Sequence, residues 1–134
     1  MHKGKKSVID RIDHLVLTVK NIETTCEFYS RAFGMQVVTF DGERKALFFG
    51  QQKINLHQEG KEYEPKAENP TPGSADLCFI TAVPAVELVA YFDSLGIRVI
   101  EGPVRRIGAL GTMISVYIRD PDMNLIEVSN YDNA

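Results

Sequence analysis

FYSRAFGMQVV at residues 28–38 and AYFDSLGIRVI at residues 90–100 share one pattern, a helical segment that ends at a glycine and runs into an apolar strand. Gly34 and Gly96 are 62 positions apart, and a tyrosine and a valine recur at the same separation. That separation also superposes LVLTV at 15–19 on LCFIT at 77–81 without a gap. The sequence therefore predicts two copies of one structural unit, and a repeat of this kind decides the fold class.

Each copy contains apolar runs typical of strands and one segment with helical spacing. The expected elements of the first copy are a strand at 12–19, a helix at 21–33, and strands at 35–40, 46–50 and 53–58. Those of the second are a strand at 75–81, a helix at 84–95, and strands at 97–101, 112–119 and 124–129, with a glycine-rich loop at 102–111. Each copy is thus a βαβββ module, and we predict an α+β fold with a cupped mixed sheet and the helices outside.

The chain length fits one domain that is built from both modules. We expect this domain to cover residues 8–130, with module 1 at 8–58, a polar linker at 59–74 and module 2 at 75–130. The linker is rich in proline and charged residues and has no hydrophobic period. Residues 1–7 are expected to form a flexible tail.

Composition excludes several classes of function. The net charge is −3 and 25% of the residues are charged, so no large basic surface for nucleic acid is expected. No apolar run approaches the roughly 20 residues that a bilayer requires, and no apolar segment follows the basic start, as a secretory signal would need. Cys26 and Cys78 do not form a CxxC pair, and we expect both to be reduced core residues of a cytoplasmic protein.

Strand alternation gathers ionisable groups on one side of the predicted strands. Leu15 and Leu17 lie on the face that a helix would cover, and His14 lies on the other face. The repeat places Asp76 where His14 stands in the first module. The ionisable groups that fall in strands at related places are His14, His57, Asp76 and Glu127.

These four groups indicate a metal site when they are taken together. A charged side chain inside a short apolar strand is costly unless it is paired or binds a metal, and imidazoles and carboxylates are suitable ligands for first-row metals. Taken singly, each histidine is more simply interpreted as a structural or surface residue, and Glu127 as one partner of a cross-strand ion pair. The repeat, which brings His14 and Asp76 together, is what favours the joint metal interpretation.

IDHLVLTVKNIETTCEFYSRAFGMQVV at 12–38 and RDPDMNLIEVS at 119–129 resemble the vicinal oxygen chelate family. This family includes glyoxalase I, methylmalonyl-CoA epimerase, fosfomycin-modifying enzymes, bleomycin-resistance proteins and type I extradiol dioxygenases. The resemblance runs from about residue 12 to residue 129 and is closest to small glyoxalase-domain proteins. It implies paired βαβββ modules that form a cup around a metal ion.

The resemblance also implies roles for individual residues. The first-strand histidine of the family falls on His14 and the last-strand glutamate on Glu127. The fifth-strand ligand falls on Asp76, where several members have histidine, and this departure leaves open whether the metal is Ni, Zn, Mn or Fe. The fourth-strand ligand falls on Asn55 or His57. Glu127 or Asp76 would then be the catalytic base.

Three further residues are candidates for contact with substrate. Tyr117 matches a substrate-contacting tyrosine of the fosfomycin enzymes, although it could equally be a packed tyrosine at the rim of the cleft. Arg106 and its neighbour Arg105 are expected in the glycine-rich loop, where they could bind an anionic substrate or remain solvated. Asn55 lies on the cleft face, and the resemblance implies a homodimer in which a second chain could complete the cleft.

The leading expectation is a metal-dependent lyase or isomerase similar to glyoxalase I. It would act on a small molecule with two adjacent oxygens and stabilise an enediolate after proton removal from carbon. A second expectation is a ring-cleaving dioxygenase with Fe(II) at His14, His57 and Glu127. A third is a non-catalytic binding protein similar to the bleomycin-resistance members, in which His14 and Asp76 simply pair.

Overall fold

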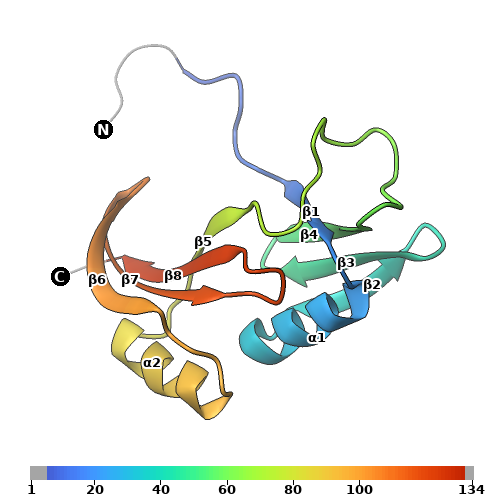
Figure 1. Cartoon of the computed structure of the whole chain (residues 1–134). Helices are drawn as coiled ribbons and strands as arrows, with labels where there is room; N and C mark the ends of the chain where they lie inside the picture. The colour runs from blue at the N-terminus through green and yellow to red at the C-terminus, as the bar shows by residue number, and fades with distance from the viewer. Residues whose placement is uncertain (1–5, 132–134) are drawn as a thin grey trace.

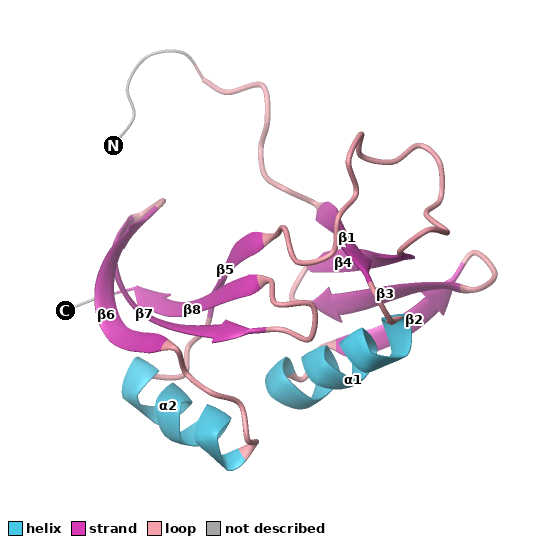
Figure 2. Cartoon of the chain, in the orientation of Figure 1, coloured by secondary structure: helices cyan, strands magenta, loops and turns pink. Residues whose placement is uncertain are grey.

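A computed structural model describes residues 6–131 of the chain, so most of the predicted tail at residues 1–7 lies outside the described residues. Two helices and eight strands form two compact units that stand side by side (Figure 1, Figure 2). The elements are β1 (His14–Val19), α1 (Ile22–Phe33), β2 (Gln36–Phe40), β3 (Arg44–Phe49), β4 (Gln52–Gln58), β5 (Asp76–Ile80), α2 (Ala85–Ser94), β6 (Glu101–Gly108), β7 (Gly111–Arg119) and β8 (Leu125–Tyr131). Within residues 6–131, neither helix is long and apolar enough to cross a membrane.

The strands form two four-stranded mixed sheets with the same topology. The order is β1-β4-β3-β2 in the first sheet and β5-β8-β7-β6 in the second. In each sheet the first strand runs parallel to the last strand of its module, and the other pairs are antiparallel. β1 begins at His14 and β5 begins at Asp76, the separation that the sequence repeat predicts. The predicted α+β fold of two βαβββ modules is confirmed.

The start and end of α1 follow from local sequence signals. The Asn21 side chain accepts a hydrogen bond from the backbone N–H of Thr24 at 2.9 Å, which caps the first turn. Gly34 ends the helix in the left-handed region at φ 70°, a conformation that glycine adopts without strain. Met35 then leads the chain into β2, so the FYSRAFG motif predicts this helix end correctly.

One hydrophobic core joins the helix-bearing faces of both sheets. Phe33 of α1 packs edge-on against Phe79 of β5 and Phe92 of α2, with ring centroids 5.5 Å and 6.1 Å away. Phe49 of β3 also packs edge-on against Phe79, with ring centroids 5.4 Å apart. A cavity of about 410 Å³ lies beside this aromatic cluster. Because both helix-bearing faces are used in the core, the opposite faces of the two sheets lie outside it.

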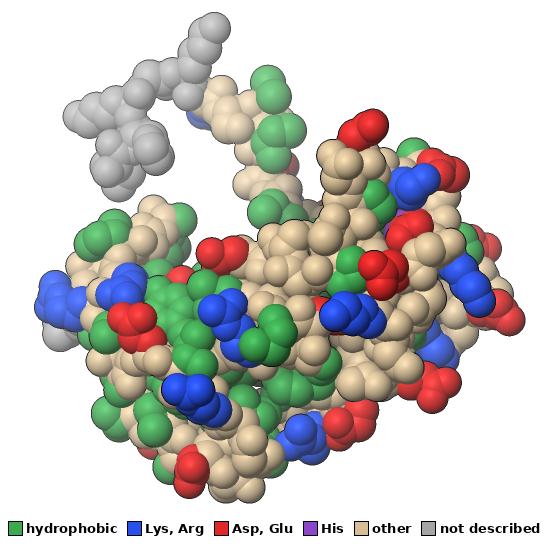
Figure 3. Space-filling view, in the orientation of Figure 1, with side chains coloured by type: hydrophobic (Ala, Val, Ile, Leu, Met, Phe, Trp, Pro, Cys, Tyr) green, Lys and Arg blue, Asp and Glu red, His purple; other side chains and the backbone are tan. Residues whose placement is uncertain are grey.

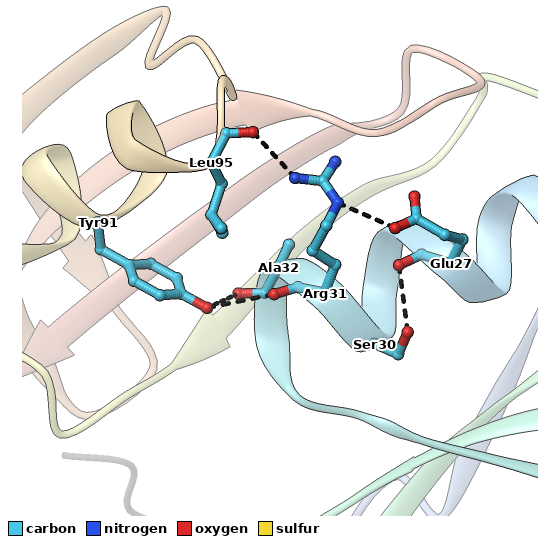
Figure 4. A network of polar contacts seen from close by, with 6 residues as sticks. All are labelled: Glu27, Ser30, Arg31, Ala32, Tyr91 and Leu95. Atoms are coloured by element: carbon cyan, nitrogen blue, oxygen red, sulfur yellow. Dashed lines mark hydrogen bonds and ion pairs between the residues drawn. The ribbon is translucent and has the colours of Figure 1, made fainter.

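Hydrogen bonds between the helices hold the two modules together (Figure 4). The hydroxyl of Tyr91 in α2 donates to the carbonyl of Ala32 in α1 at 2.8 Å. Arg31 donates from Nη1 to the carbonyl of Leu95 at 2.9 Å and from Nε to Glu27 at 3.0 Å. The end of each helix is therefore tied to the other module.

The turn between β7 and β8 is built around a buried carboxylate. Asp120 accepts hydrogen bonds from the Tyr29 hydroxyl at 2.6 Å and from the Asn124 side-chain amide at 2.8 Å. It also accepts from the backbone N–H groups of Asp122 and Asn124 at 2.9 Å and 3.0 Å. The DPDMN segment is thus the turn that the sequence predicts, and it also binds α1 of the other module.

Asp122 in this turn gives a pH-dependent prediction. Burial raises the pKa of its carboxyl from the ordinary value of 3.8, and the nearby Asp120 charge acts in the same direction. The folded state therefore holds this proton more strongly than the unfolded state, and wild-type stability falls as pH rises through the raised pKa. Asp122→Asn removes the buried charge and keeps an oxygen to accept from the backbone N–H of Lys20, a bond of 3.2 Å.

We expect Asp122→Asn to be at least as stable as wild type at pH 7.5. Its advantage should shrink as the pH falls toward 4.5, because the wild-type carboxyl then becomes neutral. Urea unfolding at several pH values measures this difference. Parallel pH profiles for the two proteins would contradict the prediction.

Three expectations about module 2 are wrong. Residues 97–100 do not form a strand, and the expected glycine-rich loop at 102–111 is mostly strand β6, whose residues alternate in burial. Gly102 permits this because its backbone, at φ 110°, approaches β7 so closely that a Cβ would lie 2.4 Å from the Ser115 carbonyl oxygen. Cys26 is buried as expected, but Cys78 is exposed and is not a core residue.

Candidate functional site

The first candidate surface is the face of the β1-β4-β3-β2 sheet that lies away from the helices. We call it the first cup face, and its central residues are His14, Val16, Lys53, Asn55 and His57. Leu17 and Val19 of β1 are buried on the opposite face, so the predicted alternation of this strand is correct. Apolar residues thus hold β1 in the core, and His14 is left at the surface.

His14 is oriented by the residue that precedes it. Its Nδ1 lies 2.8 Å from the Asp13 carboxylate. With the proton placed on Nδ1, the ring donates to Asp13 and leaves Nε2 as a free acceptor. Metal-binding histidines commonly donate their second ring N–H to a carboxylate in this way. Asp13 is a functional candidate that the sequence reasoning did not single out.

The sheet register compares the two modules residue by residue. In the first sheet Val16 is the partner of Asn55, and in the second sheet Cys78 is the partner of Glu127. Val16 and Cys78 are equivalent in the repeat. Asn55 therefore occupies in module 1 the place that Glu127 occupies in module 2, and His57 lies two residues further along β4.

Asn55 and His57 are both buried, and each has a polar atom without a hydrogen-bond partner among residues 6–131. These atoms are Oδ1 of Asn55 and Nε2 of His57. Tyr63, from the segment that joins the modules, packs edge-on against the His57 ring at 5.5 Å. Burial lowers the pKa of His57, and the Arg44 charge lowers it further. The imidazole is thus kept neutral beside a cavity of about 480 Å³.

The second candidate surface is the corresponding face of the β5-β8-β7-β6 sheet, the second cup face. A chain of hydroxyl groups orients Glu127 on this face. Ser115 donates to Glu127 Oε2 at 2.6 Å, and the Ser129 hydroxyl lies 2.6 Å from that of Ser115. Cys78 Sγ lies 3.3 Å from the Ser129 hydroxyl. Asp76, at the start of β5, is exposed.

The predicted substrate residues of module 2 also meet on this face. Arg106 donates from Nε to the Tyr117 hydroxyl at 2.9 Å and from Nη2 to Glu101 at 2.9 Å. Desolvation raises the pKa of Tyr117, so its hydroxyl is protonated and can donate a hydrogen bond. Arg106 lies on β6, not in a loop as expected, because Gly102 allows the strand to form. The expected loop position of Arg105 is wrong for the same reason.

The predicted donor groups lie on two different faces of the described part of the chain. Among residues 6–131, no group of three or more His, Cys, Asp or Glu side chains lies close enough to hold a metal ion. His14 and Asn55 are together on one face, and Asp76 and Glu127 are together on the other. The shared core explains the separation, because it joins the two sheets through their helix-bearing sides.

The family assignment rests on nearly the whole chain. The family model described as the glyoxalase/bleomycin resistance protein/dioxygenase superfamily matches residues 11–128. The chain belongs to this superfamily. The resemblance of 12–38 and 119–129 to the vicinal oxygen chelate family is therefore confirmed.

Three relatives give the superfamily assignment more detail. Virulence protein STM3117 of Salmonella typhimurium is 58% identical over 130 residues, which are 97% of this chain and 90% of that protein. Its crystal structure has a TM-score of 0.92 and covers 94% of this chain and 100% of that chain. Glyoxalase domain-containing protein RDO1 of Mycosarcoma maydis is 54% identical over 92% of this chain and 69% of its own length. Lactoylglutathione lyase of Agrobacterium tumefaciens is 26% identical, with a TM-score of 0.70, and the match covers 92% of this chain and 96% of the lyase.

Proposed function

We propose that this superfamily member is a metal-dependent lyase or isomerase that acts on a small molecule with two adjacent oxygens. We further propose that its site is completed when the first cup face of one copy meets the second cup face of another. The observation that carries the proposal is the strand register of the two sheets. In this register His14 and Asn55 of module 1 stand at the positions that Asp76 and Glu127 occupy in module 2. Equivalent positions in two repeated modules thus bear donor atoms of the kind that metal ions bind.

The residues present fit a divalent ion. Oδ1 of Asn55 is buried without a hydrogen-bond partner among the described residues, as a metal-binding oxygen would be before its ion arrives. Nε2 of His14 is free in the tautomer that Asp13 favours. Two carboxylates, of Asp76 and Glu127, would balance the charge of the ion. We therefore propose these four as the ligands, with His57 as a deeper residue beside the site.

A bound divalent ion would stabilise the negative charge that develops on two adjacent substrate oxygens. The protein itself must supply a base to remove a proton from carbon. Glu127 is held in one orientation by Ser115, whereas the carboxylate of Asp76 is exposed and has no hydrogen-bond partner within residues 6–131. Because no other described group orients Asp76, we propose it as the base in addition to its role as a ligand, and Tyr117 can donate a hydrogen bond to the substrate from the same face.

The surface supports assembly with a second copy. Ile107 and Leu110, at the β6–β7 hairpin, are 82% and 86% exposed, and Ile80 on the second cup face is 57% exposed. Figure 3 shows hydrophobic side chains at the surface over the second sheet. Exposed apolar side chains of this kind commonly mark contact surfaces.

The deciding experiment measures metal content and then activity. The full chain is purified without chelator and its metal is determined by elemental analysis. Activity is then assayed with the hemithioacetal of methylglyoxal and glutathione before and after addition of Ni, Zn, Mn or Fe. We expect about one ion per cup and activity that chelator removes.

The controls separate this function from the other members of the superfamily. A protein that stays metal-free and gains no activity with any of the four metals would overturn the proposal. Ligand-induced melting shifts that chelator does not change would then assign a binding role. Oxygen-dependent turnover of a catechol after anaerobic iron loading would instead assign a ring-cleaving dioxygenase.

A further inference from the structure

Two cations converge on one aromatic ring of the first cup face. Lys53 Nζ lies 4.3 Å from the centroid of Phe40, and the Arg44 guanidinium carbon lies 5.1 Å from the same centroid. Arg44 also lies 4.5 Å from the Tyr63 ring. Aromatic faces hold cations in place, but they do not neutralise them. We call Arg44 and Lys53 the cation pair.

Neither residue of the cation pair forms an ion pair within the described part of the chain. Two carboxylates, Asp13 and Glu62, act on this face and keep their charges, and the charges of Asp13 and Lys53 interact. Each carboxylate is oriented by another group, since Asp13 lies 2.8 Å from His14 Nδ1 and Glu62 accepts from the Gly60 backbone N–H at 2.9 Å. Both cations are half-buried, so the repulsion between them is not fully screened by water.

The guanidinium has an unmet hydrogen-bonding requirement. Nε of Arg44 is buried and has no acceptor among residues 6–131. A buried donor without an acceptor is costly, and the cost is larger for a charged group. An anion that entered the cup would supply the missing acceptor and a negative charge in direct contact with the guanidinium. Arginine and lysine are the side chains that bind carboxylate and phosphate groups in proteins.

The cation pair lies beside the proposed metal ligands. Lys53 is the register partner of His14, and Arg44 lies on β3, two residues before Ala46, the partner of Asn55. Neighbouring strands are about 4.8 Å apart, so a group bound by the cation pair would lie in the same cup as the donor atoms of His14 and Asn55.

We propose that the substrate carries an anionic group, a carboxylate or a phosphate, that Arg44 and Lys53 bind in the cup. This inference rests on the proposed function, because it names the substrate class of the same site. The anionic group would anchor one part of the molecule, and its two adjacent oxygens would reach the donors that we propose as ligands.

The test measures the binding of two simple anions to the full chain. Inorganic phosphate and malonate are titrated by calorimetry at constant ionic strength with chloride as the reference. The variants are Arg44→Gln and Lys53→Gln, and Arg44→Lys retains the charge if loss of the guanidinium disturbs folding. Lys45→Gln is the matched control, because Lys45 lies on the same strand but points to the other face and bonds Thr39 at 2.7 Å.

We expect saturable binding of at least one anion, which Arg44→Gln and Lys53→Gln each weaken about tenfold, the loss of one charge-assisted contact. Lys45→Gln should bind as wild type does, and Arg44→Lys should lie between. Preference for phosphate or for malonate identifies the anionic group.

Three results would overturn the inference. The first is that neither anion binds saturably, and the second is that Lys45→Gln weakens anion binding as much as the other variants do. The third is that the variants change only the oligomeric state, which would assign the cation pair to carboxylates of a second copy. Metal content is measured in parallel. If the protein binds the anions but takes up no metal, the proposed function is contradicted and this inference is not. If it takes up metal but binds neither anion, this inference is contradicted and the proposed function is not.

Discussion

Glu127→Gln is expected to lower metal affinity by more than about 100-fold and to abolish turnover. The substitution keeps the shape of the side chain and an oxygen that can accept from Ser115, a contact of 2.6 Å in the wild type. It removes one of the two carboxylate charges that we propose for the site. Loss of a residue that only orients a ligand typically costs 10–100-fold in metal affinity, so loss of the ligand charge itself should cost more.

Ser115→Ala separates orientation from ligation. Ser115 is fully buried and its hydroxyl donates to Glu127, so loss of this hydroxyl should cost about 10–100-fold in affinity and leave some activity. Glu101→Gln is the matched control, because Glu101 is a carboxylate of the same face that pairs with Arg106. Metal titration of the four proteins, with circular dichroism to confirm folding, decides the matter. Wild-type affinity in Glu127→Gln would remove Glu127 from the ligand set.

Asp120→Ala is expected to lower the free energy of unfolding by about 3–5 kcal/mol, the range for removing one partner of a buried charged network. Asp120 is only 3% exposed and accepts four hydrogen bonds. Its loss leaves donors of Tyr29, Asp122 and Asn124 buried without an acceptor. Because Tyr29 belongs to α1, the loss also loosens the contact between the two modules.

Two further variants test this account of Asp120. Tyr29→Phe removes one donor and keeps the packed ring, and it should cost about 1–3 kcal/mol. Asp93→Ala is the control, since Asp93 is exposed on α2 and should change stability by less than about 0.5 kcal/mol. Urea unfolding monitored by circular dichroism measures all three proteins. A cost below about 1 kcal/mol for Asp120→Ala would show that the turn does not depend on this carboxylate.

The elements that depend on local signals could be predicted from the sequence. Gly34 ends α1 because a left-handed residue is needed there, and Asp41-Gly42 forms the turn between β2 and β3 with positive φ at both residues. β6 could not be predicted in this way. Its glycines indicate a loop locally, and only the close approach of Gly102 to Ser115 shows that the sheet requires them.

Some residues of the candidate site could likewise be named from the sequence, and others could not. Alternation along β1 and the repeat were sufficient to name His14 and Asp76, because a strand side chain points to the same face as the residue two positions away. Our proposal of Asn55, and not His57, as a ligand rests on the pairing of β1 with β4, which depends on contacts between segments about 40 residues apart. Arg44 and Tyr63 were not singled out from the sequence, since neither belongs to a motif. Their importance comes from a tertiary contact, in which the guanidinium group of Arg44 lies against the ring of Tyr63.

The sequence alone determined the duplicated βαβββ scaffold and the superfamily, because periodicity, turn residues and the two motifs are local properties. Tertiary structure decided where the donor atoms lie. The core joins the helix-bearing sides of the two sheets, so among residues 6–131 the donor groups that we propose lie on two separate faces. The physical reason is that apolar burial selects which faces of the sheets come together, and that selection involves residues from the whole chain at once.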